Sequence, residues 1–305
     1  MVNVRGIARL GTLAVGLGLG AAWAHTPVAS ADSSTDLFSW PAGPDLGDLS
    51  AAALPAAPTL DLAISFDGVS LFQEGSATAA TKTGEFALAI ASGAGSDANA
   101  TGGIFDSAFA DGANSSALAN NGAEFDSAFA VGANSTADAG ILGTGDFAFA
   151  DGANSTATAG DGYFDAATIV GANGSASSYD GNGDLATVFG NGSDVSVGTG
   201  SGELATVFGN NDTGVSVENG SFDLATVFGN HDSGVSVENG HLDLATVFGN
   251  HDSGVSVESG NFDLATVFGA DSTADAGMGN FDLAAVFGDM LHAMATGGIG
   301  LVDIL

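Results

Sequence analysis

The sequence predicts an all-β protein, a single-chain β-solenoid (β-roll or β-helix) of about 12 coils with a period near 20 residues. Residues 224–269 repeat one unit almost unchanged, with Phe228, Phe248 and Phe268 at the same position in successive copies. Each copy places β-branched and aromatic residues between glycine-rich turns, which is typical of short strands. No proline occurs from Thr59 onward, and proline lacks the N–H that paired strands need.

A landmark residue recurs every 18 to 20 positions through most of the chain. Its copies are Phe72, Ile90, Phe109, Phe129, Phe149, Ile169, Phe189, Phe208, Phe228, Phe248, Phe268 and Phe287. Because a short unit at a fixed period buries its apolar face against the next copy, we expect the solenoid to span residues 61–288.

The N-terminal residues 1–31 have the pattern of a secretory signal peptide. Arg5 and Arg9 accompany an apolar stretch over 7–24, and small residues at 29–31 form a cleavage site. A transmembrane anchor is the alternative, but glycines interrupt the apolar stretch. We therefore expect a mature chain that starts at Asp32 and has no transmembrane segment.

Residues 32–60 contain four of the five prolines and many alanines, so we interpret them as a linker or an N-terminal cap. After cleavage, 36 acidic residues face the single Lys82, a formal charge of 1 − 36 = −35. A protein with this much negative charge repels phosphate groups, which argues against nucleic acid as a partner. The absence of cysteine means that disulfides do not stabilise the chain.

Within one copy, residues 223–228 and 235–238 are the expected strands, and 229–234 and 239–240 the expected turns. Side-chain alternation puts Leu224, Thr226 and Phe228 on one face, opposite Ala225 and Val227. In an earlier copy Asp106 falls on the face opposite the phenylalanines. Since a repeated aspartate is costly in a dry core, we expect the phenylalanine face to point inward.

That assignment leaves a column of valines on the outside, flanked by alanines. An exposed apolar stripe usually marks an interface, although a covering layer would also explain it. The expected interface residues are Val188, Val207, Val227, Val247, Val267 and Val286.

The last residues, 289–305, depart from the repeat and are rich in apolar side chains. A helical turn over 290–294 fits their pattern. An open solenoid end exposes unpaired amides, so we expect a C-terminal cap; a docking or sorting signal is the alternative.

Two sets of repeated polar residues are candidate metal ligands. One acidic position recurs in six successive copies, where repulsion at ~4.8 Å spacing would favour bound cations, calcium above all. Solvated carboxylates are the alternative. The acidic set is Asp184, Glu203, Asp223, Asp243, Asp263 and Asp282.

The second set lies in the turns, where His231 and His251 stand beside Asp232 and Asp252. Imidazole and carboxylate ligands suit zinc or copper. Exposed histidines from simple repeat duplication are the alternative. A threonine column, Thr187, Thr206, Thr226, Thr246 and Thr266, is similar to columns in ice-binding solenoids, but it falls on the face expected to point inward.

Residues 107–117, SAFADGANSSA, and 127–137, SAFAVGANSTA, resemble the head repeats of trimeric autotransporter adhesins. The resemblance covers residues 105–176 and implies a left-handed β-roll that binds host matrix. The glycine-, alanine- and asparagine-rich composition also resembles the mycobacterial PE-PGRS proteins, which are exported.

We find no sequence motif for catalysis, cofactor binding or a nucleophilic cysteine. Nearly identical copies also argue against an active site, which needs one coil to differ. The leading hypothesis is a non-enzymatic secreted or cell-envelope protein, structural or adhesive, whose partner is a second copy, a host or envelope protein, or a glycan. A calcium-dependent cation-binding repeat protein is the alternative, and a polysaccharide-active solenoid is the third.

Overall fold

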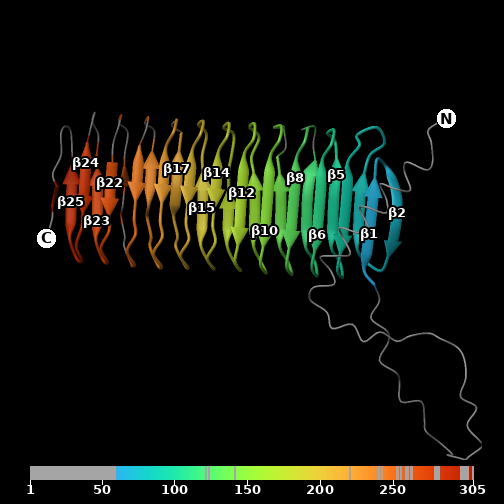
Figure 1. The fold of residues 1–305 in the computed structure, drawn as a ribbon, viewed down its shortest axis with the longest axis horizontal. Coiled ribbons are helices and arrows are strands. Elements are labelled where there is room, and N and C mark those ends of the chain that lie inside the picture. The colour runs from blue at the N-terminus through green and yellow to red at the C-terminus, as the bar shows by residue number, and fades with distance from the viewer. Residues whose placement is uncertain are drawn as a thin grey trace, which may run out of the picture. The chain divides into compact units, whose positions relative to one another are not determined.

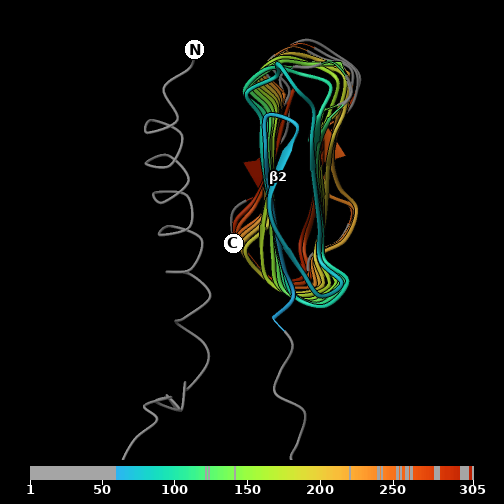
Figure 2. The same ribbon diagram turned by 90° about the vertical axis from the view of Figure 1, so that its right-hand side faces the viewer.

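The chain divides into two units, residues 1–59 and residues 60–305, of which only the second is described. In this computed structural model the described residues are 60–305 except 121, 123, 141, 220, 239, 240, 242, 252, 253, 255, 258–260, 262, 263, 278–281, 296–301, 304 and 305. The predicted signal peptide and all but the last residue of the predicted linker lie outside them. Residues 60–305 form a flattened β-solenoid with two opposed walls of strands, which confirms the predicted fold class (Figures 1 and 2).

The first wall, sheet A, has fourteen strands in the order β2-β1-β4-β6-β8-β10-β12-β14-β16-β18-β20-β22-β24-β26. Their bounds are Val69–Glu74 (β2), Leu62–Phe66 (β1), Leu88–Ser92 (β4), Ser107–Asp111 (β6), Ser127–Val131 (β8), Phe147–Asp151 (β10), Ala166–Val170 (β12), Leu185–Thr187 (β14), Leu204–Thr206 (β16), Leu224–Thr226 (β18), Leu244–Thr246 (β20), Leu264–Val267 (β22), Leu283–Val286 (β24) and Val302–Asp303 (β26).

The second wall, sheet B, has twelve strands in the order β25-β23-β21-β19-β17-β15-β13-β11-β9-β7-β5-β3. Their bounds are His292–Ala295 (β25), Thr273–Ala276 (β23), Ser256–Val257 (β21), Ser236–Glu238 (β19), Val215–Glu218 (β17), Asp194–Val197 (β15), Ser175–Ser177 (β13), Thr156–Ala159 (β11), Thr136–Ala139 (β9), Ser116–Asn120 (β7), Asp97–Thr101 (β5) and Thr78–Thr81 (β3).

Successive coils pair in parallel and in register, so equivalent residues stack directly. Leu204 pairs with Leu224, which pairs in turn with Leu244. The exception is the N-terminal end, where β1 pairs antiparallel with both β2 and β4. No helix in the described part of the chain is long and apolar enough to cross a membrane.

The core between the walls consists of small side chains. In the N-terminal coils two alanines from each wall point inward, such as Ala108 and Ala110 from β6 with Ala117 and Ala119 from β7, all at most 2% exposed. In the C-terminal coils valine replaces part of the alanine. The walls therefore lie close together, as the end-on view shows (Figure 2), and leave no room for an inward phenylalanine in each coil.

The prediction that the phenylalanine face points inward is wrong. Phe228 is 41% exposed, while Val227 and Ala225 on the other face are fully buried. Aspartate is tolerated inside because the backbone of the next coil donates to it: the N–H of Asp126 lies 3.2 Å from Oδ1 of the buried Asp106. The assumption that a repeated aspartate must face water caused the error.

The landmark register is also corrected at two points. Thr168 pairs with Thr187, so Ile169 is level with Val188 and is fully buried, unlike Phe189. Phe72 belongs to the antiparallel strand β2, outside the parallel stack. Both errors arise because the repeat was aligned on apolar residues without asking which face of the sheet each one occupies.

The turns bring backbone against backbone. Gly112 has a φ of +132°, and a Cβ on it would lie 2.5 Å from the carbonyl oxygen of Gly132 in the next coil. Beside these glycines, the side-chain amides of Asn114, Asn134 and Asn154 each donate to the asparagine of the next coil, ending at Asn173, at 3.2 to 3.3 Å. Such stacked amides stabilise parallel in-register arrays.

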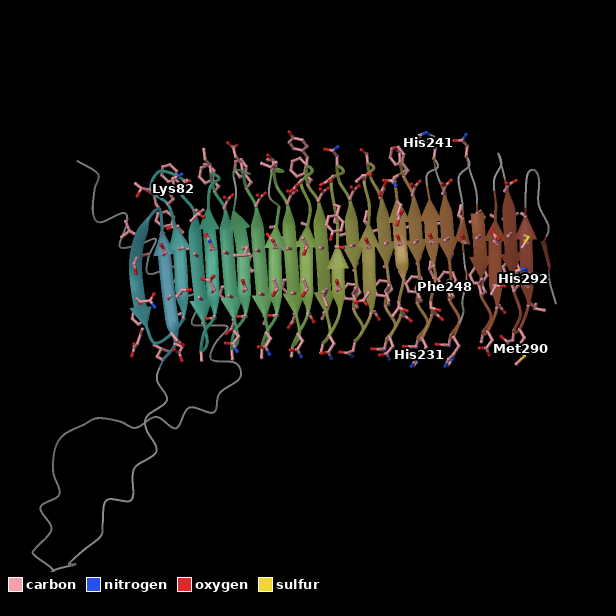
Figure 3. The ribbon with its side chains drawn as sticks, turned by 180° about the vertical axis from the view of Figure 1, so that it is seen from behind. Lys82, His231, His241, Phe248, Met290 and His292 are labelled. Carbon is pink, nitrogen blue, oxygen red and sulfur yellow. The ribbon has the colours of Figure 1, made fainter. Side chains whose placement is uncertain are left out.

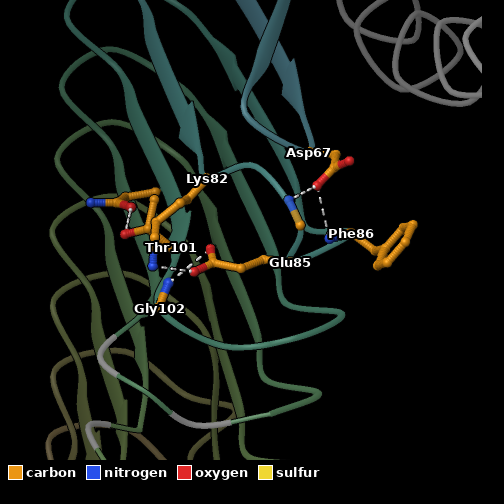
Figure 4. Close-up of polar contacts among 8 residues, drawn as sticks. Asp67, Lys82, Glu85, Phe86, Thr101 and Gly102 are labelled. Carbon is orange, nitrogen blue, oxygen red and sulfur yellow. Dashed lines mark hydrogen bonds and ion pairs between the residues drawn. The ribbon is translucent and has the colours of Figure 1, made fainter.

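The C-terminal end of the described chain continues the parallel stack. The helical turn considered over 290–294 is not formed, because β25 pairs with β23 and extends sheet B. Near the other end, Lys82 forms an ion pair with Glu85 at 2.9 Å, and Glu85 also accepts the N–H of Gly102 at 3.0 Å (Figure 4). Asp67 accepts the N–H of Phe86 at 3.3 Å in the same first coil.

Candidate functional site

The outer side of sheet A carries an apolar surface without charge in the C-terminal coils. From β14 to β24 its outward positions form three parallel columns, which we call the Leu–Thr–Phe face. The columns are Leu185, Leu204, Leu224, Leu244, Leu264 and Leu283; Thr187, Thr206, Thr226, Thr246, Thr266 and Ala285; and Phe189, Phe208, Phe228, Phe248, Phe268 and Phe287.

The phenylalanine column is a continuous stack. Neighbouring ring centroids lie 4.8 to 5.1 Å apart, with interplanar angles of 1° to 13°. The rings are 40 to 47% exposed, and Phe248 is labelled on this surface in Figure 3. Because each ring covers the faces of its neighbours, the column presents ring edges to solvent. Edges suit packing against apolar groups better than stacking under a flat sugar ring.

Aromatic residues continue over the N-terminal coils of sheet A at shifted positions. Phe109 and Phe129 lie 6.2 Å apart, and Phe129 and Phe147 lie 5.8 Å apart. Here the face also contains charge, since Asp111 and Asp151 pair in register with Val131. The uncharged part is therefore confined to the C-terminal coils.

Further exposed phenylalanines stand in the turns that lead into sheet A. Their backbone is left-handed, which is rare for a bulky residue. Phe125 stacks on Phe105 at 5.3 Å, whereas the rings of Phe164 and Phe222 lie over Gly145 and Gly202 of the preceding coil. The set is Phe86, Phe105, Phe125, Phe164 and Phe222, with φ of 53° to 68° and 52 to 72% exposure.

The outer side of sheet B is different in chemistry. Its outward residues are mostly serine, threonine and acidic, for example Asp194 on β15, Ser216 on β17 and Asp275 on β23. In the C-terminal coils the solenoid therefore has a polar, acidic outer side on sheet B and an apolar one on sheet A.

A buried column of carboxyl groups runs along the interior, close to the turns that lead into sheet A. Oδ1 of Asp126 accepts the N–H of Asp146 at 3.0 Å, and Oδ1 of Asp146 accepts the N–H of Asp165 at 3.0 Å. These residues are at most 1% exposed. The described members are Asp106, Asp126, Asp146, Asp165, Asp184, Glu203, Asp223, Asp243 and Asp282.

The second carboxyl oxygen packs against turn backbone. Oδ2 of Asp146 and Oδ2 of Asp184 are buried and have no hydrogen-bond partner among the described residues. A Cβ on Gly143 would lie 2.0 Å from the first of these atoms, and one on Gly181 would lie 1.6 Å from the second. The column is closely packed on this side, and its glycines give the carboxyls their space.

This environment disfavours negative charge. Burial, together with the neighbouring carboxylates of Asp126 and Asp165, raises the pKa of Asp146 from 3.8 to about 7. Burial likewise raises the pKa of Asp106, Asp165 and Asp223 to about 6. Asp146 is thus partly protonated at neutral pH, and a protonated carboxyl can itself donate a hydrogen bond.

The predicted interface valines are not on the surface. Val188, Val207, Val227, Val247, Val267 and Val286 are all 0% exposed and form the core. The prediction is wrong because inside and outside were exchanged, and the same exchange moves the threonine column to the outer face. The exposed apolar surface that sequence reasoning missed is the phenylalanine column.

The predicted metal ligands are dispersed or enclosed. Asp263 and Asp252 lie outside the described residues. The solvated state considered for the acidic set is wrong, since its other members are buried. His231 and His251 stack at 5.1 Å on the exposed side of their turn, whereas Asp232 is fully buried and points inward. Among the described residues no three His, Cys, Asp or Glu side chains are grouped closely enough to hold a metal ion.

The geometry therefore identifies one candidate contact surface, the Leu–Thr–Phe face, and one interior column of titratable groups. Comparison of the chain with protein-family models and with curated proteins finds no match in either.

Proposed function

We propose that this protein is an exported, non-enzymatic structural or adhesive module whose contact surface is the Leu–Thr–Phe face. The observation that carries the proposal is the stacked column from Phe189 to Phe287, 40 to 47% exposed on the uncharged part of sheet A. Contiguous exposed apolar surface of this extent usually marks an interaction site in a soluble protein.

Other features fit a passive module better than an enzyme. The outward residues of β16, β18 and β20 are leucine and threonine in each coil, and phenylalanine follows two residues after each strand. A row of identical coils offers a repeated surface and no single differentiated position for chemistry. Export is inferred from the basic, apolar and small-residue order of residues 1–31.

The test is expression of the full chain in a bacterial host. We expect N-terminal sequencing to find Asp32 first, and the protein to stay with the envelope fraction. Phe228→Ser with Phe248→Ser should shift it to the medium, because the apolar contact is weakened. Ser216→Ala with Ser236→Ala on sheet B is the matched control and should leave it in place.

An uncleaved chain in the cytoplasm would refute export. Equal fractionation of all three proteins would refute the role of the face. Release of reducing ends from any member of a polysaccharide panel would refute the non-enzymatic assignment and favour the polysaccharide-active alternative.

A further inference from the structure

We infer that the Leu–Thr–Phe face pairs with the same face of a second copy of this chain, about a two-fold axis parallel to the solenoid axis. The inference deepens the proposed function, because it rests on that face being a contact surface and names what occupies it. Three observations lead to it: the distribution of charge, the size of the face and the order of its columns.

The distribution of charge indicates which face of the solenoid can pair with a second copy. The chain has a formal net charge of −33, so two copies repel when most of their surfaces meet. On sheet B, acidic residues such as Asp194 and Glu218 would face their counterparts. From β14 to β24 the outward positions of sheet A hold only leucine, threonine, alanine and phenylalanine. Two copies can approach through this face without bringing like charges together.

The area is sufficient for a stable dimer. With coils ~4.8 Å apart and outward residues of a strand ~6.8 Å apart, three columns over six coils cover about 600 Å² per copy. Two copies would bury about 1,200 Å², the lower limit of specific interfaces. The surface is thus large enough by itself and does not need an unrelated partner to cover it.

The column order selects the axis. A two-fold axis parallel to the solenoid places the leucine column of each copy opposite the phenylalanine column of the other, with threonine facing threonine in the middle. The larger side chains then meet the smaller ones along the whole length. A two-fold axis perpendicular to the solenoid would instead place phenylalanine on phenylalanine and leave a gap along the leucines. The first arrangement packs more completely.

Sedimentation of the purified chain tests the inference. We expect a species of twice the mass of the processed chain. Phe228→Asp with Phe248→Asp should raise the dissociation constant at least 100-fold, because each new carboxylate is buried opposite leucine. Ser216→Asp with Ser236→Asp adds the same charge on sheet B and should leave the dimer intact. Circular dichroism would establish that each variant keeps its β-structure.

Cross-linking tests the axis, and the natural chain has no cysteine to interfere. Opposed sheets pack ~10 Å apart, too far for a disulfide but within reach of a short bis-maleimide. Thr226→Cys should cross-link to Thr226→Cys of a second copy, as pairing through this face requires. In a mixture of Leu224→Cys and Phe228→Cys chains, the two variants should cross-link to each other, because only the parallel axis places leucine opposite phenylalanine. Cross-linking of Phe228→Cys to itself would overturn the parallel axis. Ser216→Cys should not cross-link.

A chain that remains a monomer at about 100 µM, or that cross-links equally through both positions, would overturn the pairing. A monomer that still remains with the envelope through Phe228 and Phe248 would overturn the pairing alone and give the face to an envelope component. A monomer that is also released regardless of these residues would overturn the proposed function as well.

Discussion

The buried carboxyl column predicts that this protein loses stability as the pH rises from 5 to 8. For Asp146 the pKa is about 7 in the folded state, against an ordinary value of 3.8. A raised carboxyl pKa means that the folded state binds the proton more tightly than the unfolded chain. The stabilisation is therefore complete below about pH 4 and is lost as the pH passes through 7. This is opposite to the usual effect of a salt-bridged aspartate.

The magnitude follows from the two pKa values. Between pH 5 and pH 8, a carboxyl with a pKa of about 7 when folded and 3.8 when unfolded removes about 2.6 kcal/mol from the free energy of unfolding. An asparagine in place of Asp146 would stay neutral and keep an oxygen for the N–H of Asp165. Asp146→Asn should therefore flatten the profile by about that amount, or by about 5 to 10 °C in Tm at pH 8 relative to pH 5.

The assay is thermal unfolding, followed by circular dichroism at pH 5, 6, 7 and 8. These values lie above the isoelectric point of about 4.1, where the low net charge would promote association. Asp194→Asn, an exposed site on sheet B, is the control and should leave the profile of the natural chain unchanged. If stability rises from pH 5 to pH 8, or if Asp146→Asn keeps the original slope, the carboxyl column is not protonated as argued.

Three further perturbations test the turns and the interior. Gly112→Ala should lower the free energy of unfolding by more than about 2 kcal/mol in chemical unfolding. Gly122→Ala is the control and should lower it by about 1 kcal/mol, because a Cβ there meets nothing within 4 Å. Equal losses would contradict the close contact between coils at Gly112. Phe222→Gly should change the free energy of unfolding by less than about 1 kcal/mol, because glycine removes the strain of the left-handed backbone and so offsets the lost packing of the ring on Gly202. A larger loss would show that the ring stabilises the fold. Removing calcium with EDTA should leave Tm unchanged, because the turn backbone closes the buried carboxyl column. A fall in Tm of more than about 5 °C would favour the calcium-dependent alternative.

The sequence predicted the solenoid because its evidence is periodic. The in-register pairing of Leu224 with Leu244, and the turns between strands, follow from spacing and turn chemistry alone. The faces could be separated but not oriented by the same means. Alternation shows that Ala225 and Val227 share a side, yet nothing in a period of two says which side meets the other wall.

One signal in the sequence could have oriented the faces. The outward position of the middle column holds Phe149 in one coil and Thr168 in the next, a change in size that a filled interior would not accept. Ala148 and Ala167, beside them and inward, stay small. A column of unvarying small residues indicates two walls in close contact. The buried aspartates required coordinates, because their partners are backbone amides one coil away.

The turn phenylalanines argue that the exposed aromatic surface is more than a by-product of the repeat. Phe105, Phe125 and Phe164 have left-handed backbone, which costs a residue with a side chain about 1 to 2 kcal/mol relative to glycine. Glycine stands at the corresponding turn position in Gly183 and Gly202, with φ of 72°. Stability alone gives phenylalanine no advantage over glycine at this position. Rings that are more than half exposed at most offset that cost by packing within the chain, so contact with another surface is the consistent explanation for them.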